Sequence, residues 1–294
     1  MKTMIHELCL KLFKTETIEK AIDILKDQGW WQSEDFWHPV GNNPNNGSIV
    51  LNQAATATGS IAEHCTNIDD QTFIHECLKR GINPEGPDAP KSPKDALKRF
   101  FNVPNGELAN ISGKERTKLA ELSKLIATGT KQNPNFILQD KATGQSAKSA
   151  IGTILSLTSG NKVKMQFTKG QHTMGSTAVM AYTDFQVIIS KQHPSAMDPN
   201  DETAEHVCFT AIRKREPKGN EKNPVIEYLA PDKNKLFHFA AESLLVRTGE
   251  APYLYNEELE HGMLRKLYDY KMEPKKLKEG IITTKLNFKV SLLI

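Results

Sequence analysis

The stretch Ser60-Ile61-Ala62-Glu63-His64-Cys65-Thr66-Asn67-Ile68-Asp69-Asp70 predicts the helix around which the rest of the chain is organised. At about 100° per residue, Asn67 and Asp70 fall within roughly 40° of Glu63, and the apolar side chains face the core. We expect this helix to cover residues 52–80. Carboxylate and amide oxygens one turn apart suit Mg²⁺, which keeps several waters and often shares its coordination shell with phosphates. The alternative for this helix alone is a solvated polar face.

Composition indicates a soluble globular protein. The chain has 294 residues, of which 25% are charged and 38% hydrophobic, enough for one large domain or two smaller ones. Its 38 basic and 35 acidic residues nearly balance at +3, so charge gives no indication of nucleic-acid binding. No apolar run approaches the ~20 residues that span a bilayer. The N-terminus lacks a secretory signal and the four cysteines are dispersed, so we expect a cytoplasmic protein with reduced thiols.

Apolar periodicity and turn residues predict the secondary structure. Helices are expected over residues 3–28, 52–80, 94–101, 112–126, 146–157 and 174–182, and strands over residues 136–140, 185–190, 207–213, 225–229 and 263–268. Helices dominate first and strands follow, without a regular βαβ succession. This order predicts an α+β fold, a two-layer sandwich of a mixed β-sheet with helices on one face.

Three regions are expected along the chain. Residues 1–41 form a helical extension, whose tryptophans Trp30, Trp31 and Trp37 indicate a local core or an interface. Residues 42–275 form the main domain. Residues 276–294 are a tail or the truncated start of a further domain.

Asp140-Lys141-Ala142-Thr143-Gly144-Gln145 follows a predicted strand directly. A carboxylate at a strand end can accept the exocyclic amino hydrogen of adenine, and Gly144 lets the backbone approach the base closely. The alternative is an ordinary aspartate-initiated turn.

Gly170-Gln171-His172-Thr173-Met174-Gly175-Ser176-Thr177 precedes an alanine-rich helix. Exposed backbone N–H groups at such a turn can bind phosphates. The turn is neither a Walker A loop nor a Rossmann fingerprint. Lys162, in the polar segment before it, is a candidate lid residue over a bound nucleotide; the alternative is a surface loop.

These three motifs, in this order, resemble those of the GHKL (Bergerat-fold) ATPase superfamily, and most closely bacterial heat-shock-chaperone-like ATP-binding proteins. The resemblance covers roughly residues 42–190, with residues 260–268 as a terminal strand of the same domain. The family's first motif usually reads Asp-x-Gly-x-Gly, whereas Ala142 stands at the first glycine here. Alanine is unfavourable there only if its φ must be positive.

The resemblance implies a role for each matching residue. Glu63 would be the general base that orients the attacking water, and Asn67 would coordinate Mg²⁺. Asp70 would support the site, Asp140 would bind the adenine amino group, and Gly144 would lie beside the base.

The glycine turn has implied roles as well. Gly170 and Gly175 would hinge the lid and open the backbone to the phosphates, with Ser176 and Thr177 next to them.

The resemblance implies a function: Mg²⁺-dependent ATP binding and slow hydrolysis that drive a lid and dimerisation cycle in a chaperone-like or antiviral defence system. Expected partners are an adenine nucleotide, a second copy of the chain, and a further protein or missing C-terminal domain. Two alternatives stay open. One is a nucleotide-sensing module without hydrolysis, and the other is an interaction scaffold with a vestigial pocket.

The nine histidines are scattered along the chain. Their positions indicate packed or surface side chains rather than metal ligands. His172, inside the glycine turn, is the one that merits a test.

Overall fold

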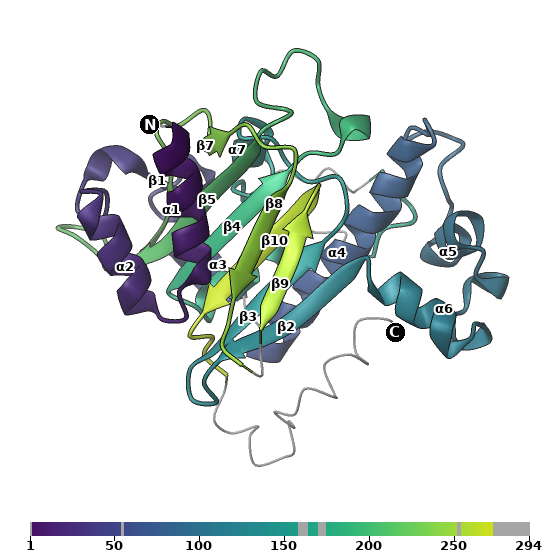
Figure 1. The fold of residues 1–294 in the computed structure, drawn as a ribbon, viewed down its shortest axis with the longest axis horizontal. Helices are drawn as coiled ribbons and strands as arrows, with labels where there is room; N and C mark the ends of the chain where they lie inside the picture. The colour runs from purple at the N-terminus through teal and green to yellow at the C-terminus, as the bar shows by residue number, and fades with distance from the viewer. Residues whose placement is uncertain (1, 54–55, 158–163, 170–174, 252–253, 273–294) are drawn as a thin grey trace.

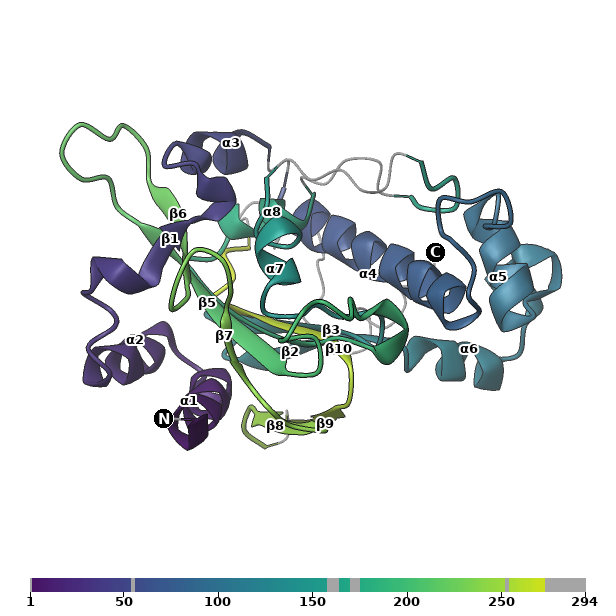
Figure 2. The ribbon, with the colours of Figure 1, turned by 90° about the horizontal axis from the view of Figure 1, so that it is seen from above.

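The computed structural model describes residues 2–53, 56–157, 164–169, 175–251 and 254–272. It is built on an antiparallel sheet with a layer of structure on each face (Figures 1 and 2). The α+β class is as predicted.

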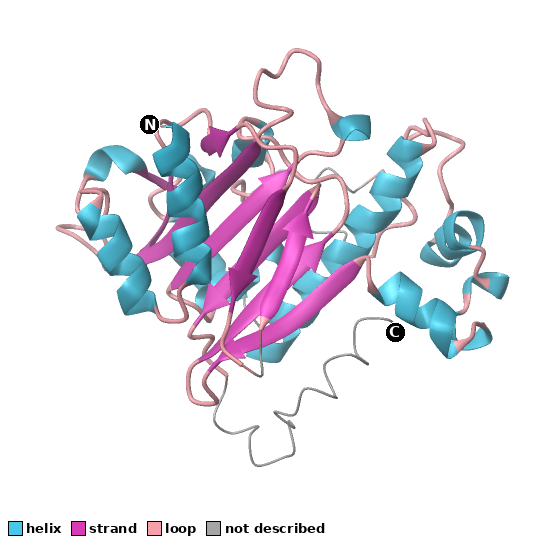
Figure 3. Ribbon diagram, in the orientation of Figure 1, coloured by secondary structure: helices cyan, strands magenta, loops and turns pink. Residues whose placement is uncertain are grey.

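The main sheet has the strand order β1-β6-β5-β4-β10-β3-β2, with β7 paired to β5. Its strands are β1 (Trp37–Pro39), β2 (Ser123–Gly129), β3 (Pro134–Asp140), β4 (Phe185–Lys191), β5 (Val207–Arg215), β6 (Val225–Leu229), β7 (Phe237–Phe239) and β10 (Gly262–Tyr268). Every described pair is antiparallel, so the expected mixed sheet is corrected. Strand β10 comes last among these strands in the sequence, yet it lies between β3 and β4 (Figure 3).

Helix α4 (Ala57–Lys79) is the main element on one face of the sheet. The side chain of Thr56 starts it by accepting the N–H of Gly59 at 2.9 Å. The apolar residues of the predicted stripe are buried on Phe136, Leu138 and Leu267 of the sheet, as expected from the periodicity. The same side of the sheet carries α3 (Asn46–Gln53), α7 (Ser149–Gly152) and α8 (Gly175–Ala178), whereas α5 (Pro93–Phe101) and α6 (Gly113–Ala120) lie beyond the edge of the sheet, past the end of α4.

The opposite face is covered too, which corrects the expectation of helices on one face. Here lie α1 (Lys2–Lys14), α2 (Ile18–Asp27) and the hairpin of β8 (Leu244–Thr248) and β9 (Tyr255–Leu259) (Figure 2). Strands β4 and β5 are buried along nearly their whole length, so apolar side chains emerge on both sides of the sheet. Both faces therefore require cover.

The predicted N-terminal extension is joined to the main sheet. It supplies strand β1, and α1 packs in the same core as the sheet. The tryptophans pack on the sheet rather than in a separate local core: the Trp30 ring stacks on Phe237 at 4.5 Å, and the Arg213 guanidinium lies 3.9 Å from the Trp37 ring.

Two predicted helices differ from the structure. The helix expected over residues 112–126 ends at Ala120, and Ser123–Gly129 pairs with β3 instead, because the sheet edge offers a partner to the β-branched and apolar residues there. The helix expected over residues 146–157 is only the short α7. Short 3₁₀ helices span Glu34–Phe36, Val40–Asn42, Pro104–Gly106, Leu108–Asn110, Val179–Ala181 and Pro194–Ala196. Among the helices in the described part of the chain, none combines the length and hydrophobicity needed to traverse a lipid bilayer.

A buried lysine joins β10 to the N-terminal helices. Lys266 is fully buried, and its Nζ donates to the carbonyl oxygens of Phe13 at 3.0 Å and Thr15 at 2.6 Å. The same Nζ lies 2.7 Å from a carboxylate oxygen of Glu16. Burial alone would raise the pKa of Glu16, but Lys266 and hydrogen bonds such as that from Thr248 lower it to about 2.

Glu16→Gln is expected to reduce the free energy of unfolding at neutral pH by about 3 kcal/mol, because it leaves a buried ammonium without its counter-charge. Since the pKa of Glu16 is lowered on folding, this stabilisation is present above pH 4.5 and is lost as the pH falls toward about 2. Urea unfolding measures both quantities. Glu19→Gln, on the exposed start of α2, is the control. An equal loss in both variants would contradict the assigned role.

Candidate functional site

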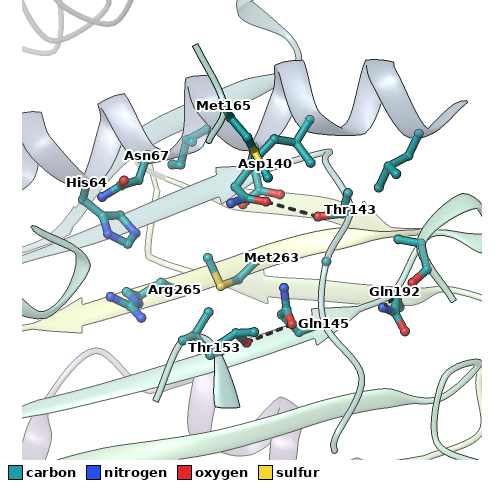
Figure 4. A pocket seen from close by; sticks show the side chains of 17 residues that line it. His64, Asn67, Asp140, Thr143, Gln145, Thr153, Met165, Gln192, Met263 and Arg265 are labelled. Atoms are coloured by element: carbon teal, nitrogen blue, oxygen red, sulfur yellow. Dashed lines mark hydrogen bonds between the residues drawn. The ribbon is translucent and has the colours of Figure 1, made fainter. Parts of the chain in front are cut away.

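A cavity of about 300 Å³ lies between α4 and the sheet. This volume is at the lower end of the range for small-molecule sites. The cavity is lined by His64, Asn67, Ile68, Gln71, Ile74, Leu78, Asp140, Thr143, Gly144, Gln145, Thr153, Ile154, Met165, Gln192, Ala196, Met263 and Arg265 (Figure 4).

Helix α4 forms one wall of the cavity. Asn67, Gln71, Ile74 and Leu78 follow one another at intervals of three or four residues, so they share one helical face. Asn67 thus borders the cavity. Glu63, one turn earlier, is exposed to solvent and does not belong to the lining of the cavity.

The loop after β3 forms the end of the cavity. Asp140 is 3% exposed, and its Oδ1 accepts the N–H of Ala142 at 3.0 Å. Ala142 has a negative φ, so alanine fits this position without strain despite the glycine that the resembling family has there. Thr143 donates its hydroxyl hydrogen to the side-chain oxygen of Gln71 at 3.3 Å, which links the loop to α4.

Gly144 is required by the backbone packing at this point. Its φ is +60°, and a Cβ there would lie 1.9 Å from the carbonyl oxygen of Lys191 and 2.9 Å from that of Gly262. The ends of β4 and β10 thus account for the glycine, and the approach of its backbone to an adenine base stays a prediction.

Gly144→Ala is expected to destabilise the protein by about 3 kcal/mol or more, because a positive φ and a collision with a carbonyl oxygen act together. Gly152→Ala is the matched control, since a Cβ at that position has no heavy atom within 4 Å among the described neighbours. Thermal unfolding of the two variants measures the difference. A Gly144→Ala protein as stable as the wild type would refute the packing account.

The carboxyl of Asp140 has an unusual titration. Burial raises its pKa to about 6, although the backbone N–H groups of Ala142 and Met263 act to lower it. At neutral pH the Asp140 carboxyl is therefore ionised in most molecules and can only accept hydrogen bonds. At mildly acidic pH it is protonated and can donate one.

The raised pKa of Asp140 predicts a pH-dependent contribution to stability. A carboxyl whose pKa is raised on folding contributes its whole stabilisation below pH 3.8, and this stabilisation is lost as the pH rises through about 6. The stability of the wild type minus that of Asp140→Asn should therefore fall by about 2–3 kcal/mol between about pH 4 and pH 8. Chemical unfolding across this range measures it. Asp88→Asn, which replaces an exposed carboxylate, is the control, and a difference that does not change with pH would contradict the prediction.

Asp70 lies beside the cavity and is fully buried. Its carboxylate accepts the backbone N–H of Lys169 at 2.8 Å. Burial raises the pKa of the neighbouring Asp69 to about 6, against the opposing effect of Lys169. Asp70 thus holds the chain against α4 immediately before the predicted glycine turn.

The glycine turn itself is described only at its end. Gly175, Ser176 and Thr177 begin α8, which packs against α4, and Thr177 is buried. Lys162, Gly170 and also His172 lie outside the described residues.

Several cavity residues were not predicted from the sequence, namely Gln71, Gln145, Gln192, Met263 and Arg265. Gln71 follows Asn67 by four residues, and this helical spacing was the available signal. The sequence around Arg265 gives no comparable indication, because it does not show which face of the strand lies under α4. Burial lowers its pKa to about 10, so it is cationic at neutral pH. In Figure 4 it lies toward the same end of the cavity as Asn67 and His64.

No protein-family model matches the chain, and comparison with curated proteins finds no similar sequence. The structural class of the protein is therefore defined from its fold and its cavity alone. The chain is an α+β protein with a ligand-sized cavity, lined by both apolar and polar side chains, between a long helix and an antiparallel sheet.

Proposed function

We propose that this chain binds an adenine nucleotide with Mg²⁺ in the cavity beneath α4, in a Bergerat-type arrangement. One observation carries the proposal: Asn67 and Asp140 border the same cavity. The two residues are far apart in the sequence and belong to separate motifs. Gly144, the third residue of the predicted constellation, borders it as well. The order of the motifs, their resemblance to the GHKL superfamily and this convergence support one another.

The adenine ring would lie at the Asp140 end. The Asp140 carboxyl accepts the N–H groups of Ala142 and Met263, and its remaining lone pairs could accept the exocyclic amino hydrogen and discriminate against a carbonyl at that position. Apolar side chains on both walls, Ile74 of α4 and Met263 of β10, suit the faces of a purine.

The phosphates would lie at the Asn67 end, where Arg265 supplies a positive charge. The half-buried Asn67 offers one amide oxygen to the cavity, which fits Mg²⁺ because this ion takes few protein ligands and keeps its waters. When bound, Mg²⁺ would neutralise charge on the phosphates. Asp70 would keep the chain before the glycine turn close to this end through Lys169.

The position of Glu63 favours a second candidate, nucleotide binding without turnover. Glu63 lies on α4 one turn before Asn67, but its side chain is exposed. A general base must reach the attacking water. Hydrolysis would therefore require this end of the cavity to close over the nucleotide, as the predicted lid would do, and a sensor would not. The expected homodimer and the chaperone-like or defence role stay predictions.

Asn67→Ala is expected to weaken Mg-ATP binding at least tenfold, because it removes the proposed oxygen ligand from the cavity wall. Titration calorimetry with ATP, with and without Mg²⁺, measures the change. Asn133→Ala, in the exposed turn between β2 and β3, is the control. Unchanged affinity in the Asn67 variant would overturn the proposal.

Glu63→Ala is expected to preserve nucleotide affinity and to abolish phosphate release, because an exposed side chain contributes little to binding and the general base acts only in the reaction. A phosphate-release assay beside calorimetry separates the two candidates. Tight binding without phosphate release in the wild type would select the sensor. Turnover that survives in the variant would remove Glu63 from the mechanism.

A further inference from the structure

Three histidines from distant parts of the chain meet beside the cavity. They are His75 on α4, His193 after β4, and His261 in the turn between β9 and β10. Their ring centroids are 4.5 Å apart for His75 and His193, 5.3 Å for His75 and His261, and 4.6 Å for His193 and His261. One ring nitrogen from each lies within 4.8 Å of the others. Their scattered positions in the sequence gave no sign of this convergence.

The three rings are held in defined orientations. Nδ1 of His261 donates to the carbonyl oxygen of Ala142 at 2.9 Å, in the tautomer that leaves the lone pair on Nε2. A metal-ligating histidine usually donates its other ring N–H to a carbonyl or carboxylate in this way. Nδ1 of His193 accepts the backbone N–H of Ser195 at 3.1 Å and lies 2.8 Å from the hydroxyl of the same residue. Metal binding through Nε2 therefore requires the ring to shift its proton from Nε2 to Nδ1, which would then donate to the hydroxyl instead of accepting the backbone N–H.

His75 completes the cluster from the helix side. It is 4% exposed, and its buried Nδ1 forms no hydrogen bond with the described residues. Burial lowers its pKa to about 4, with His193 and His261 acting in the same direction, and burial also lowers the pKa of His193. Both rings are therefore neutral at physiological pH, which is the form that ligates metals.

One ion-pair group of α4 lies beside the cluster. Lys79 and Glu76 both act on the histidines, and they pair with each other at 2.9 Å. Glu76 also pairs with Arg80, so the charge of Lys79 is offset only in part.

We propose that His75, His193 and His261 bind one divalent transition-metal ion of the Zn²⁺ type, with the fourth position left to water. Three neutral imidazoles are a known Zn²⁺ ligand set. Zn–N bonds of about 2.0–2.1 Å place tetrahedral ligand nitrogens about 3.3 Å apart, so the rings must close by about 1.5 Å. His193, half-buried in a connecting segment, has the most room to move.

The ion would join the C-terminal half of α4 to the loop that ends the cavity. His261 holds the carbonyl of Ala142, and the N–H of His193 donates to the carbonyl oxygen of Thr143 at 2.8 Å. The metal would therefore fix the backbone on which Asp140 and Gly144 are mounted. This site uses none of the residues assigned to the nucleotide.

Titration with CoCl₂ and ZnCl₂ tests the proposal on the full chain, purified without a polyhistidine tag, stripped with a chelator and kept free of nucleotide. The expected result is one ion per chain, a visible tetrahedral Co²⁺ spectrum that Zn²⁺ abolishes, and a raised Tm. His193→Ala and His261→Ala should each weaken binding about 100-fold or more, since even groups that only orient a ligand are worth 10–100-fold.

His206→Ala is the matched control, because His206 and His238 form a separate half-buried pair with Nδ1 atoms 2.9 Å apart. It should bind the metal like the wild type. Circular dichroism of the stripped variants verifies folding, and His193→Ala is retained for the test if His261→Ala unfolds. Absence of the Co²⁺ spectrum in the wild type, or binding that survives in His193→Ala and is lost in His206→Ala, overturns the proposal.

Discussion

The structure depends on the insertion of β10 between β3 and β4. This strand follows both partners by at least seventy residues in the sequence. It joins the two parts of the open sheet, and its Met263 pairs with both Asp140 and Ser190. Its side chains alternate between two layers: Lys266 and Tyr268 face the N-terminal helices, whereas Arg265 and Leu267 face α4. Both coverings of the sheet are thus joined through one strand, which explains why so polar a residue as Lys266 can be fully buried there.

The same strand determines the shape of the cavity. Gly262, at the start of β10, and Lys191, at the end of β4, leave no room for a side chain at residue 144. The loop that follows Asp140 is therefore held by the sheet, by the hydrogen bond between Thr143 and Gln71, and by the hydrogen bond from His261 to Ala142. Such bracing is what a binding site needs, because a ligand then meets polar groups whose positions are already defined.

Local patterns anticipated much of the fold. The strands β3, β4, β5, β6 and β10 were predicted because continuous apolar, β-branched runs between turn residues are recognisable without tertiary information. The helix around Asn67 was predicted from its apolar spacing. Strand β2 was missed because its residues adopt extended structure only through pairing with β3 along the full ladder. The β8–β9 hairpin alternates buried and exposed residues over only five positions in each strand, too short a pattern to stand out.

The sequence by itself determined which face of α4 is apolar and where the chain must turn. These properties depend on neighbours within a few residues. Only the tertiary structure decided that both sheet faces are covered, that Arg265 and Gln192 reach the cavity, that Glu63 is exposed, and that three scattered histidines converge. Such outcomes depend on strand order and on contacts between residues far apart in sequence, whose energies no local periodicity encodes.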